Sequence, residues 1–484
     1  MPGVNFEKTY APTGRLNSLH CLISYAASRG LKFHQIDIKS AFPNALLAEV
    51  VYILVPQGLN LDKQAFCLRL NKAIYGLKLA SLAWYQRLKQ WLLQAGFSAC
   101  VLDPCVFLRS KGMMTWLYIH IEDIAIFGEN VSSFIEEISQ VFDIKDMGAA
   151  DLMMGIEVVH GDGFISLDQS HFTDSLLDLY GLSGFKSVAT PLEPNVHLQP
   201  ANDEEVERFL SLGVNYRSAI GSINYSSTAT RPDLSHAVSS LLQLVYSQGL
   251  DNEVRGYSNA DWGNSRATRR SVTGILAFFS GNLVLWKTRK QPSVSISTAE
   301  AEYKALCDLV SELLWLRQWS RECHLLPLNS ATPVHEDNQS CINTANGDYN
   351  LNNKRMKHVD IQLHFIKEAV KGSIIDLIYT PTSLILANFL TKSVCRPILS
   401  QSMNALRIVE VGVRGGVLKI TIQTKTIVNA PLLEQQTLKR HYLKIIQIMI
   451  STRRSLCMIE NSRRYKPKSN NLNHFISNNL LSSF

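Results

Sequence analysis

Paired cysteines are missing from this chain. Its nine cysteines are scattered singly and form no Cys-x-x-Cys pair, which argues against a disulfide framework and against a zinc ribbon. The chain also lacks a charge-free apolar run of membrane-spanning length. Its start, Met-Pro-Gly-Val-Asn-Phe-Glu-Lys, has neither the basic nor the apolar region of a signal peptide. We therefore expect a soluble intracellular protein in a reducing compartment, without a membrane partner.

Excess positive charge is scarce outside the C-terminal segment. The 484 residues include 48 Lys and Arg and 41 Asp and Glu, but 413–484 alone holds twelve basic residues against two Glu. Any nucleic-acid affinity of the body must therefore come from local basic grooves. The C-terminal segment has weak periodicity and Asn-Asn-Leu repeats, so we expect it to be disordered. A hydrophobic content of 46% predicts a globular body with two or three cores.

Hydrophobic spacing predicts the main elements of this body. Residues at helical intervals indicate helices over 19–28 and 80–94. Strand-forming residues indicate strands over 33–38, 50–55 and 66–70, the last two joined by a turn. A change of composition near residue 255 opens a second block of alternating strands and helices that ends near residue 392. The chain therefore has at least two structural units.

Two acidic residues interrupt the apolar segment 117–128. Strand-forming residues on both sides of Glu122 and Asp123 predict a β-hairpin with the carboxylates at its tip. Neighbouring carboxylates in an apolar hairpin are typical of a divalent cation shared with a third acid. A plain solvent-exposed turn is the alternative, and the lack of a turn residue after Asp123 disfavours it. Asp37, near the end of the predicted strand 33–38, is the candidate third acid.

These three acids are the groups that nucleotidyl transfer needs. Two magnesium ions roughly 4 Å apart activate a primer hydroxyl and neutralise a triphosphate, and acids on neighbouring strands hold them. Phe42 follows Asp37 by five residues. An aromatic ring at that position would lie under the sugar and exclude a 2′-hydroxyl.

Five segments together resemble the reverse transcriptase of copia-type LTR retrotransposons, in a similarity that runs from about residue 3 to 396. They are Phe33–Phe42, Lys72–Lys78, Ala83–Tyr85, Ile144–Gly148 and Thr230–Asp233. The resemblance implies that Asp37 and Asp123 bind Mg²⁺ and that Phe42 is the sugar gate. It also implies that the nucleotide and template pocket is lined by Tyr75, Gly76 and Lys78.

Glu122 departs from this family's pattern, which has Asp at the first position of the acid pair. The extra methylene displaces the carboxylate by roughly 1 Å, and such a shift can cost on the order of a hundredfold in rate. The family's Ala-Pro reads Ala80-Ser81 here, which removes a rigid turn. The family's first finger strands, with their basic triphosphate contacts, also have no counterpart in the sequence. We therefore expect an incomplete nucleotide clamp and weakened polymerisation.

A second set of segments resembles the ribonuclease H domain of the same elements. It comprises Gly256–Trp262, Arg269–Gly274, Leu285–Gln291, Ser297–Tyr303, Asp337–Gln339 and Lys357–Asp360. Two-metal hydrolysis of RNA needs about four carboxylates at one point. The resemblance places Glu302 and Asp337 at two ligand positions, but Asn259 and Asn388 at the other two. An amide has no charge to hold Mg²⁺, so we expect the site to be abolished.

Three other patterns each have two interpretations. Ser297-x-x-Glu300 is a capping box, so Glu300 is interpreted as structural although it is an acid near Glu302. His358 and His364 could bind a metal, but without cysteine partners they fit fold and surface roles better. A basic segment could grip a hybrid backbone by charge and stacking or form a solvated hairpin edge. It contains Trp286, Lys287, Arg289 and Lys290.

The predicted fold is an α+β reverse transcriptase palm with fingers, followed by an α/β RNase H-like domain and a disordered basic tail. The division is a truncated-finger reverse transcriptase over 1–190, a shortened thumb and connection over 191–253, the RNase H-like domain over 254–396, and the tail over 397–484. No Asp-Thr/Ser-Gly protease signature and no integrase zinc cluster is present. The chain is therefore expected to be a fragment of a larger polyprotein.

The resemblance implies templated addition of deoxynucleoside triphosphates to a DNA primer on an RNA template. It also implies cleavage of RNA in an RNA–DNA hybrid, Mg²⁺ at both sites, and a location in cytoplasmic virus-like particles or the nucleus. The alternative is a catalytically inactive relic that at most binds nucleic acid. Two further alternatives are a second block that was never a nuclease and an integrase of RNase H fold. The integrase explains none of the palm segments.

Overall fold

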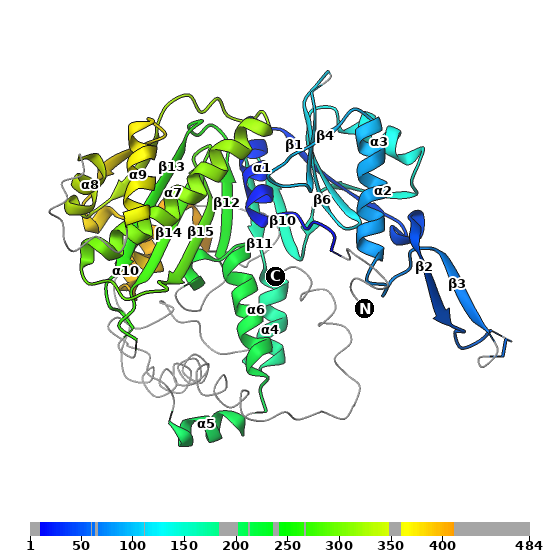
Figure 1. Cartoon of the computed structure of the whole chain (residues 1–484), viewed down its shortest axis with the longest axis horizontal. Coiled ribbons are helices and arrows are strands. Elements are labelled where there is room, and N and C mark those ends of the chain that lie inside the picture. Colours follow the sequence, from blue (N-terminus) through cyan, green and yellow to red (C-terminus); the bar gives the residue numbers. More distant parts are fainter. Residues whose placement is uncertain are drawn as a thin grey trace.

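The computed structural model describes residues 10–59, 61–62, 66–110, 112–182, 202–211, 213–235, 242–265, 268–347 and 360–410. Three larger β-sheets and one projecting hairpin form the body within these ranges (Figure 1). None of the helices there combines the length and the apolar character needed to cross a membrane. Of the sequence predictions, His358 and the tail from residue 411 onward lie outside the described residues.

An antiparallel sheet, here called the palm sheet, carries the predicted acid hairpin. Its strands are β4 (Ser98–Ala99), β5 (Val106–Arg109), β6 (Thr115–His120), β7 (Asp123–Gly128), β1 (Lys32–Ile38) and β8 (Ile144–Ala149), in that spatial order. Helices α2 (Ala80–Gln94) and α3 (Val131–Ser139) contribute to the core on one face, and α1 (Leu16–Arg29) to the core on the other. The predicted helix over 80–94 and the predicted strand over 33–38 are confirmed.

Both faces of the palm sheet are covered, which explains the uninterrupted apolar sequence of its central hairpin. In β7, Ile124 and Ile126 join the cluster with α2 and α3, whereas Ala125 and Phe127 join the cluster with α1. Successive side chains of a strand point to opposite faces, so a strand buried on both sides needs apolar residues throughout. The ring of Phe127 stacks on Phe33 of β1 with centroids 4.6 Å apart.

A two-stranded hairpin projects from the palm, as Figure 1 shows. It consists of β2 (Leu46–Leu54) and β3 (Cys67–Lys72), and the 3-10 turn η1 (Phe42–Asn44) joins β2 to the palm side. Apolar residues of β2 such as Tyr52 and Leu54 are exposed. The sequence similarity assigned this segment to fingers that lack their first strands, and that assignment stays a prediction.

A second sheet, here called the connecting sheet, joins segments from distant parts of the sequence. Its order is β18 (Ile408–Glu410), β12 (Leu242–Ser247), β11 (Phe164–Asp168), β10 (Ile156–Gly161) and β9 (Leu152–Met153). Helices α4 (Ser170–Leu179) and α6 (Tyr216–Ala229) extend beside each other below it in Figure 1, with α5 (Asp203–Leu210) further away. The ring of Phe172 on α4 meets that of Tyr225 on α6 edge to face.

Residues 396–410 differ from the low-order tail that the sequence predicted from residue 397. They form α10 (Arg396–Ala405) and β18, which pairs with β12. Leu399, Met403, Leu406 and Ile408 are buried, and their spacing gives this segment an apolar side that can pack on the body. The ordered body therefore extends at least to residue 410.

The third sheet has the strand arrangement expected of an RNase H-like domain. Strands β13 (Val254–Asp261), β14 (Val272–Phe279) and β15 (Asn282–Lys290) are antiparallel, and β16 (Thr332–Glu336) and β17 (Ile375–Tyr379) extend the sheet in parallel. The order is β15-β14-β13-β16-β17. Helices α7 (Thr298–Glu322), α8 (Gln339–Asn346) and α9 (Asp360–Lys371) separate the last strands along the chain, as parallel neighbours require.

The palm and the RNase H-like sheet share one core. The hydroxyl of Ser24 on α1 donates to the carbonyl of Phe279 at 2.5 Å and accepts from the amide of Asn282 at 3.2 Å. The indole N–H of Trp116 on β6 donates to the carbonyl of Cys323, after α7, at 2.7 Å. One cluster of buried residues runs through both halves. The structural boundary between cores therefore does not coincide with the boundary between the two resembled domains.

Candidate active sites

The palm acids meet where β1 and β7 end. These strands pair antiparallel with Asp37 directly opposite Asp123, and cross-strand partners lie close enough for their side chains to interact. Glu122 occupies the turn between β6 and β7, and its carbonyl accepts from the N–H of Ile38 at 3.0 Å. The predicted hairpin is confirmed, and all three acids of the sequence prediction stand at this corner of the palm sheet.

The turn itself is unusual because Ile121 has a positive φ of 59°. A two-residue hairpin turn normally places Gly, Asn or Asp in such a conformation, and a β-branched residue there is strained. The indole N–H of Trp84 on α2 donates to the carbonyl of Ile121 at 2.7 Å. The hydrogen bond from this buried tryptophan holds the turn in place, and with it the neighbouring acids Glu122 and Asp123.

Glu122 contacts a residue of the predicted nucleotide pocket. Its Oε2 atom accepts a hydrogen bond from the Tyr75 hydroxyl at 3.0 Å. The Tyr75 ring lies against Phe42 with centroids 4.6 Å apart. The structure thus brings together Phe42, Tyr75 and Glu122, three residues that the sequence singled out for different reasons. Sequence reasoning did not foresee the bond between the last two.

Gln35 is a candidate site residue that the sequence did not reveal. Its buried amide donates to Oδ1 of Asp123 at 2.9 Å and so fixes that carboxylate. The available signal was strand alternation, because residues two apart on a strand share a face. Gln35 stands two before Asp37, and a buried polar residue on the face of the acids needs a partner there.

Burial and mutual repulsion raise the pKa of two palm carboxyls. Loss of hydration raises the pKa of Glu122; the bond from Tyr75 opposes the shift, while the charges of Asp37 and Asp123 add to it. Burial also raises the pKa of Asp123; the Gln35 bond opposes the shift and the charge of Asp37 adds to it. A bound cation would remove the penalty on the ionised forms.

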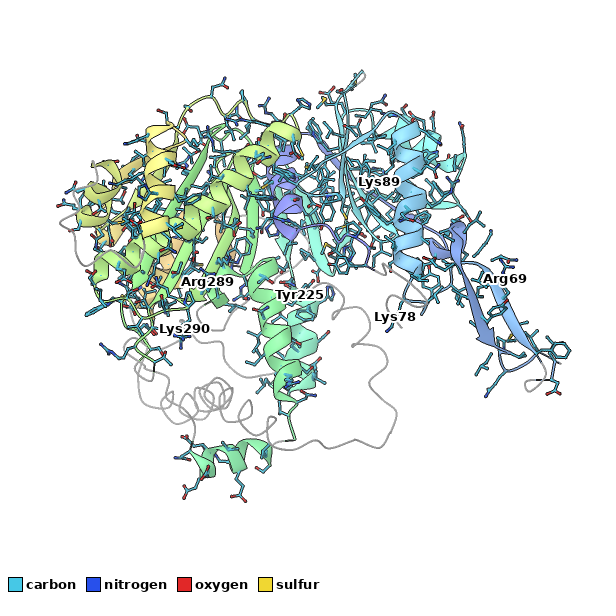
Figure 2. The ribbon with its side chains drawn as sticks, viewed as in Figure 1. Arg69, Lys78, Lys89, Tyr225, Arg289 and Lys290 are labelled. Carbon is cyan, nitrogen blue, oxygen red and sulfur yellow. The ribbon has the colours of Figure 1, made fainter. Side chains whose placement is uncertain are left out.

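The other predicted pocket residues lie on the segment between β3 and α2. Gly76 has a positive φ of 86°, a conformation that glycine adopts without steric cost. Lys78 is exposed, and Figure 2 shows it near the N-terminal end of α2. Asp37 and Asp123 fit the Mg²⁺ that the resemblance implies, because they are carboxylates on neighbouring strands. Glu122 fits it less well while it bonds Tyr75.

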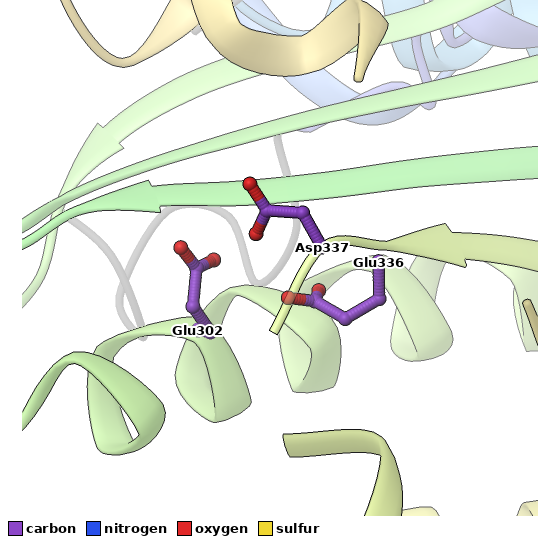
Figure 3. Close-up of side chains that lie close together, drawn as sticks. All are labelled: Glu302, Glu336 and Asp337. Carbon is purple, nitrogen blue, oxygen red and sulfur yellow. The ribbon is translucent and has the colours of Figure 1, made fainter. Parts of the chain in front are cut away.

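In the RNase H-like half, carboxylates gather at the end of β16. Within the described part of the chain, only Glu302, Glu336 and Asp337 bring three possible ligand atoms within 4.8 Å of one another. Glu302 comes from α7, and the other two come from the end of β16 and the residue after it (Figure 3). The sequence placed Glu302 and Asp337 at ligand positions, and the structure brings them together.

Glu336 was missed by the sequence reasoning. It is fully buried; its Oε2 accepts from the Ser258 hydroxyl at 2.7 Å and its Oε1 from the N–H of Asn338 at 3.2 Å. Residues 332, 334 and 336 are the buried positions of β16. Strand alternation in the sequence could therefore have predicted that Glu336 is buried. Its proximity to Ser258 depends on the parallel pairing of β13 and β16.

The two amides at predicted ligand positions are engaged in hydrogen bonds. The buried Asn259 on β13 donates to the Thr391 hydroxyl at 2.6 Å. Asn388, in the 3-10 segment η5 (Leu386–Leu390), donates to the carbonyl of Thr382 at 2.5 Å. An Asn side chain offers one neutral oxygen and no charge. The residues present therefore do not fit a site with two Mg²⁺ ions, which needs about four carboxylates.

Glu300 caps α7, as the sequence predicted. Its N–H donates to the Ser297 hydroxyl at 3.1 Å, and its carboxylate accepts from the N–H of Ile296 at 2.8 Å. Lys304 forms an ion pair with it at 2.7 Å. All the polar contacts of Glu300 serve the start of the helix, which leaves Glu302 as the acid of this helix that faces the cluster.

The buried acids should make stability depend on pH. Burial raises the pKa of Glu336 from 4.5 to about 8, so the folded state holds this proton more tightly than the unfolded chain. In metal-free buffer, the stabilisation is present below pH 4.5 and is lost as the pH rises through about 8. We expect the free energy of unfolding, measured with urea, to fall over this range. Glu336→Gln should remove much of the fall, whereas the exposed Glu368→Gln should not. An equal fall in both variants would contradict the assignment.

The predicted nucleic-acid segment lies on β15 and is largely engaged within the protein. Trp286 stacks on the His20 ring with centroids 5.3 Å apart and donates to the carbonyl of Ser227 at 2.6 Å. Arg289 pairs with Asp308 of α7 at 2.6 Å. The remaining contacts are Lys287 with Glu312 and Lys290 with Ser265. Figure 2 shows Arg289 and Lys290 at the lower end of the RNase H-like half. Their contact with nucleic acid stays a prediction.

Comparison with known proteins agrees with this arrangement. The family model described as reverse transcriptase (RNA-dependent DNA polymerase) matches residues 1–194. The retrovirus-related Pol polyprotein from transposon TNT 1-94 of Nicotiana tabacum is 28% identical over 432 residues, 81% of this chain and 32% of the relative. The corresponding polyprotein from transposon RE2 of Arabidopsis thaliana is 28% identical over 87% of this chain and 30% of the relative.

The similarity extends well beyond the palm. The relatives align with more than four fifths of the chain, whereas the reverse transcriptase model ends at residue 194. The chain spans about a third of the length of the curated relatives it matches. Residues 1–194 therefore match the reverse transcriptase family, and the chain is similar to retrovirus-related Pol polyproteins of transposons over more than four fifths of its length.

Proposed function

We propose that the chain is an RNA-directed DNA polymerase with an attached RNase H-like domain, and that this copy has a weakened polymerase site and no hybrid cleavage. The observation that carries the proposal is the register of the palm sheet, which sets Asp37 opposite Asp123 beside Phe42 and Tyr75. The substrates would be an RNA template, a DNA primer and deoxynucleoside triphosphates.

Each residue of the palm has a defined task in this proposal. Asp37 and Asp123 would hold Mg²⁺, which when bound activates the primer hydroxyl and neutralises the triphosphate. Gln35 holds the Asp123 carboxylate in place through its amide. Phe42, supported by the ring of Tyr75, would form the floor under the sugar and exclude a 2′-hydroxyl. Lys78 is exposed beside this pocket and would contact phosphate.

Loss of hybrid cleavage is proposed from the charges at the second site. Asn259 and Asn388 stand where carboxylates are needed, and both amides donate to protein oxygens. Of the four resembled ligand positions, Glu302 and Asp337 are the two that carry a carboxylate, half of what two ions require. RNA–DNA hybrid could still be bound in this half without being cut.

A relic that binds nucleic acid without catalysis is the second candidate, and one contact favours it. The Tyr75 hydroxyl bonds Glu122, which engages both a residue of the predicted nucleotide pocket and one of the three palm acids. Displacement of a metal-binding carboxylate by about 1 Å can cost on the order of a hundredfold in rate. The two candidates differ in whether any extension of a primer is measurable.

Primer extension on an RNA template distinguishes them. With Mg²⁺ or Mn²⁺, we expect slow incorporation of deoxynucleotides by the purified chain and none by Asp123→Asn, which loses a metal-binding charge. Asp174→Asn changes an exposed residue of α4 in the same way and should leave the rate unaltered. Binding of a primed template without any extension, under either metal, would overturn the polymerase proposal in favour of the relic.

A further inference from the structure

The end of helix α7 in the RNase H-like half is bonded to an edge of the palm sheet. One carboxylate oxygen of Glu322, the last residue of α7, accepts from the Cys100 thiol at 2.9 Å and from the N–H groups of Val101 and Leu102 at 3.1 and 3.3 Å. These three donors lie between β4 and β5. Hydrogen bonds to a carboxylate are stronger than those to a neutral acceptor. We call this set of three bonds the Glu322 latch.

A second contact from the same helix end reaches the strand that precedes the palm acids. The indole N–H of Trp116 on β6 donates to the carbonyl of Cys323 at 2.7 Å, and its ring meets that of Tyr25 on α1 edge to face. Strand β6 pairs with β5, which follows the latch, and with β7, which begins at Asp123. The end of α7 is therefore connected to the acid corner through neighbouring strands of one sheet.

The apolar core on the α1 face of the palm sheet continues into the RNase H-like half. Phe127 of β7 belongs to the same buried cluster as Trp319 of α7 and Leu326, whereas the cluster on the opposite face consists of residues between 36 and 144 only. Figure 1 shows α7 crossing the RNase H-like half and ending near α1. Unfolding of that half would return apolar side chains of the palm to water, which costs free energy in proportion to their area.

The amides at the two altered ligand positions are compatible with this support. Asn259 and Asn388 are buried and donate to protein oxygens, so neither leaves its amide group without a partner. Neither residue takes part in the Glu322 latch or in the bond to Trp116. Loss of ligand charge at the second site therefore does not require loss of the contacts between the two halves.

We propose that the RNase H-like half has a second function, which is to support the polymerase palm through the end of α7. The Glu322 latch and the bond to Trp116 hold β5 and β6, and the shared core makes the two halves unfold as one cooperative unit. That support is the remaining role of this half rests on the proposed loss of hybrid cleavage. The support itself depends neither on that loss nor on polymerisation.

Hydrogen exchange of the full chain in increasing urea tests this cooperativity. Mass spectrometry follows peptides from β6 and β7 in the palm separately from peptides of β14 and β15 in the RNase H-like half. We expect both sets to lose protection at the same urea midpoint, because elements that unfold together share one free energy of opening. Loss of protection in β14 and β15 while β6 and β7 stay protected would overturn the proposal.

Substitution of Glu322 tests the latch. Glu322→Ala removes the acceptor of three bonds, so we expect exchange over 98–109 to accelerate at least about tenfold without urea and the midpoint of both halves to fall. Glu322→Gln keeps an oxygen acceptor without the charge and should have a smaller effect. Glu312→Ala, on the same helix, removes a contact with Lys287 inside the RNase H-like half and should leave exchange over 98–109 unchanged.

The outcomes are kept distinct from those of the palm chemistry. Circular dichroism confirms that each variant is folded, and Glu322→Gln serves if Glu322→Ala is not. Faster exchange confined to the RNase H-like half, or an equal effect of Glu312→Ala on 98–109, would contradict a supporting role of the latch. Failure of primer extension bears on the reaction at the palm acids alone and would leave these results standing.

Discussion

Glu122→Asp should raise the rate of primer extension on an RNA template by on the order of a hundredfold. The longer Glu side chain reaches the Tyr75 hydroxyl at 3.0 Å. Aspartate is one methylene shorter, so it should release Tyr75 and leave its carboxylate free to bind a cation together with Asp37 and Asp123. The rate is measured as deoxynucleotide incorporation at saturating Mg²⁺.

Two controls separate geometry from charge in this experiment. Glu129→Asp makes the same chemical change at an exposed position just after β7 and should not alter the rate. Tyr75→Phe removes the hydrogen bond but keeps the long side chain, so we expect a much smaller gain than from Glu122→Asp. If Glu122→Asp left extension unchanged in a folded protein, the position of this carboxylate would not be what limits the polymerase.

The double substitution Asn259→Asp with Asn388→Asp should produce Mg²⁺-dependent cleavage of RNA in an RNA–DNA hybrid. It raises the carboxylates at the four resembled ligand positions from two to four. A metal ion contributes several kcal/mol of transition-state stabilisation, and 1.36 kcal/mol is a tenfold change in rate. We therefore expect a gain of roughly a thousandfold over the unaltered chain, measured on a labelled hybrid.

The hydrogen-bond partners around residues 259 and 388 differ, so the two substitutions should differ in their effect on stability. Asp at 259 can accept a hydrogen bond from the Thr391 hydroxyl, which now accepts from the amide, once that hydroxyl gives up its bond to the carbonyl of Asn388. Asp at 388 would face the carbonyl of Thr382, so this substitution should destabilise the protein until Mg²⁺ binds. Asn343→Asp, at an exposed position of α8, is the matched control. A folded double variant that does not cleave would show that restoring the two acids is not sufficient for cleavage.

The sequence predicted local structure correctly where apolar residues recur at regular intervals and the residues at the ends favour a helix or strand boundary. Helix α2 spans Ala80–Gln94 as its spacing predicted, and the acid hairpin forms at Glu122 and Asp123. The tail prediction failed between residues 397 and 410, because the apolar spacing of that segment has meaning only where a surface exists for it to cover. In the folded chain α10 contacts η5, and β18 pairs with β12.

Some candidate site residues could likewise be predicted from the sequence, and others could not. Asp37, Asp123, Glu302 and Asp337 could be named from motif and resemblance, because the chemistry demands their type and spacing. Gln35 and Glu336 could not be assigned a partner, because their contacts with Asp123 and Ser258 cross between strands far apart in the sequence. A one-residue change of register would turn each of them to the opposite face.

The sequence by itself determined the family resemblance and the main helices and strands, and the resemblance predicts altered ligand positions at Glu122, Asn259 and Asn388. These are properties of residue type and local order. Tertiary structure alone decided that Glu122 bonds Tyr75, that Glu336 joins Glu302 and Asp337, and that palm and RNase H-like halves share a core. The reason is that strand pairing and helix packing bring together residues that are far apart in the sequence. The number of residues between two positions does not predict the distance between them in space.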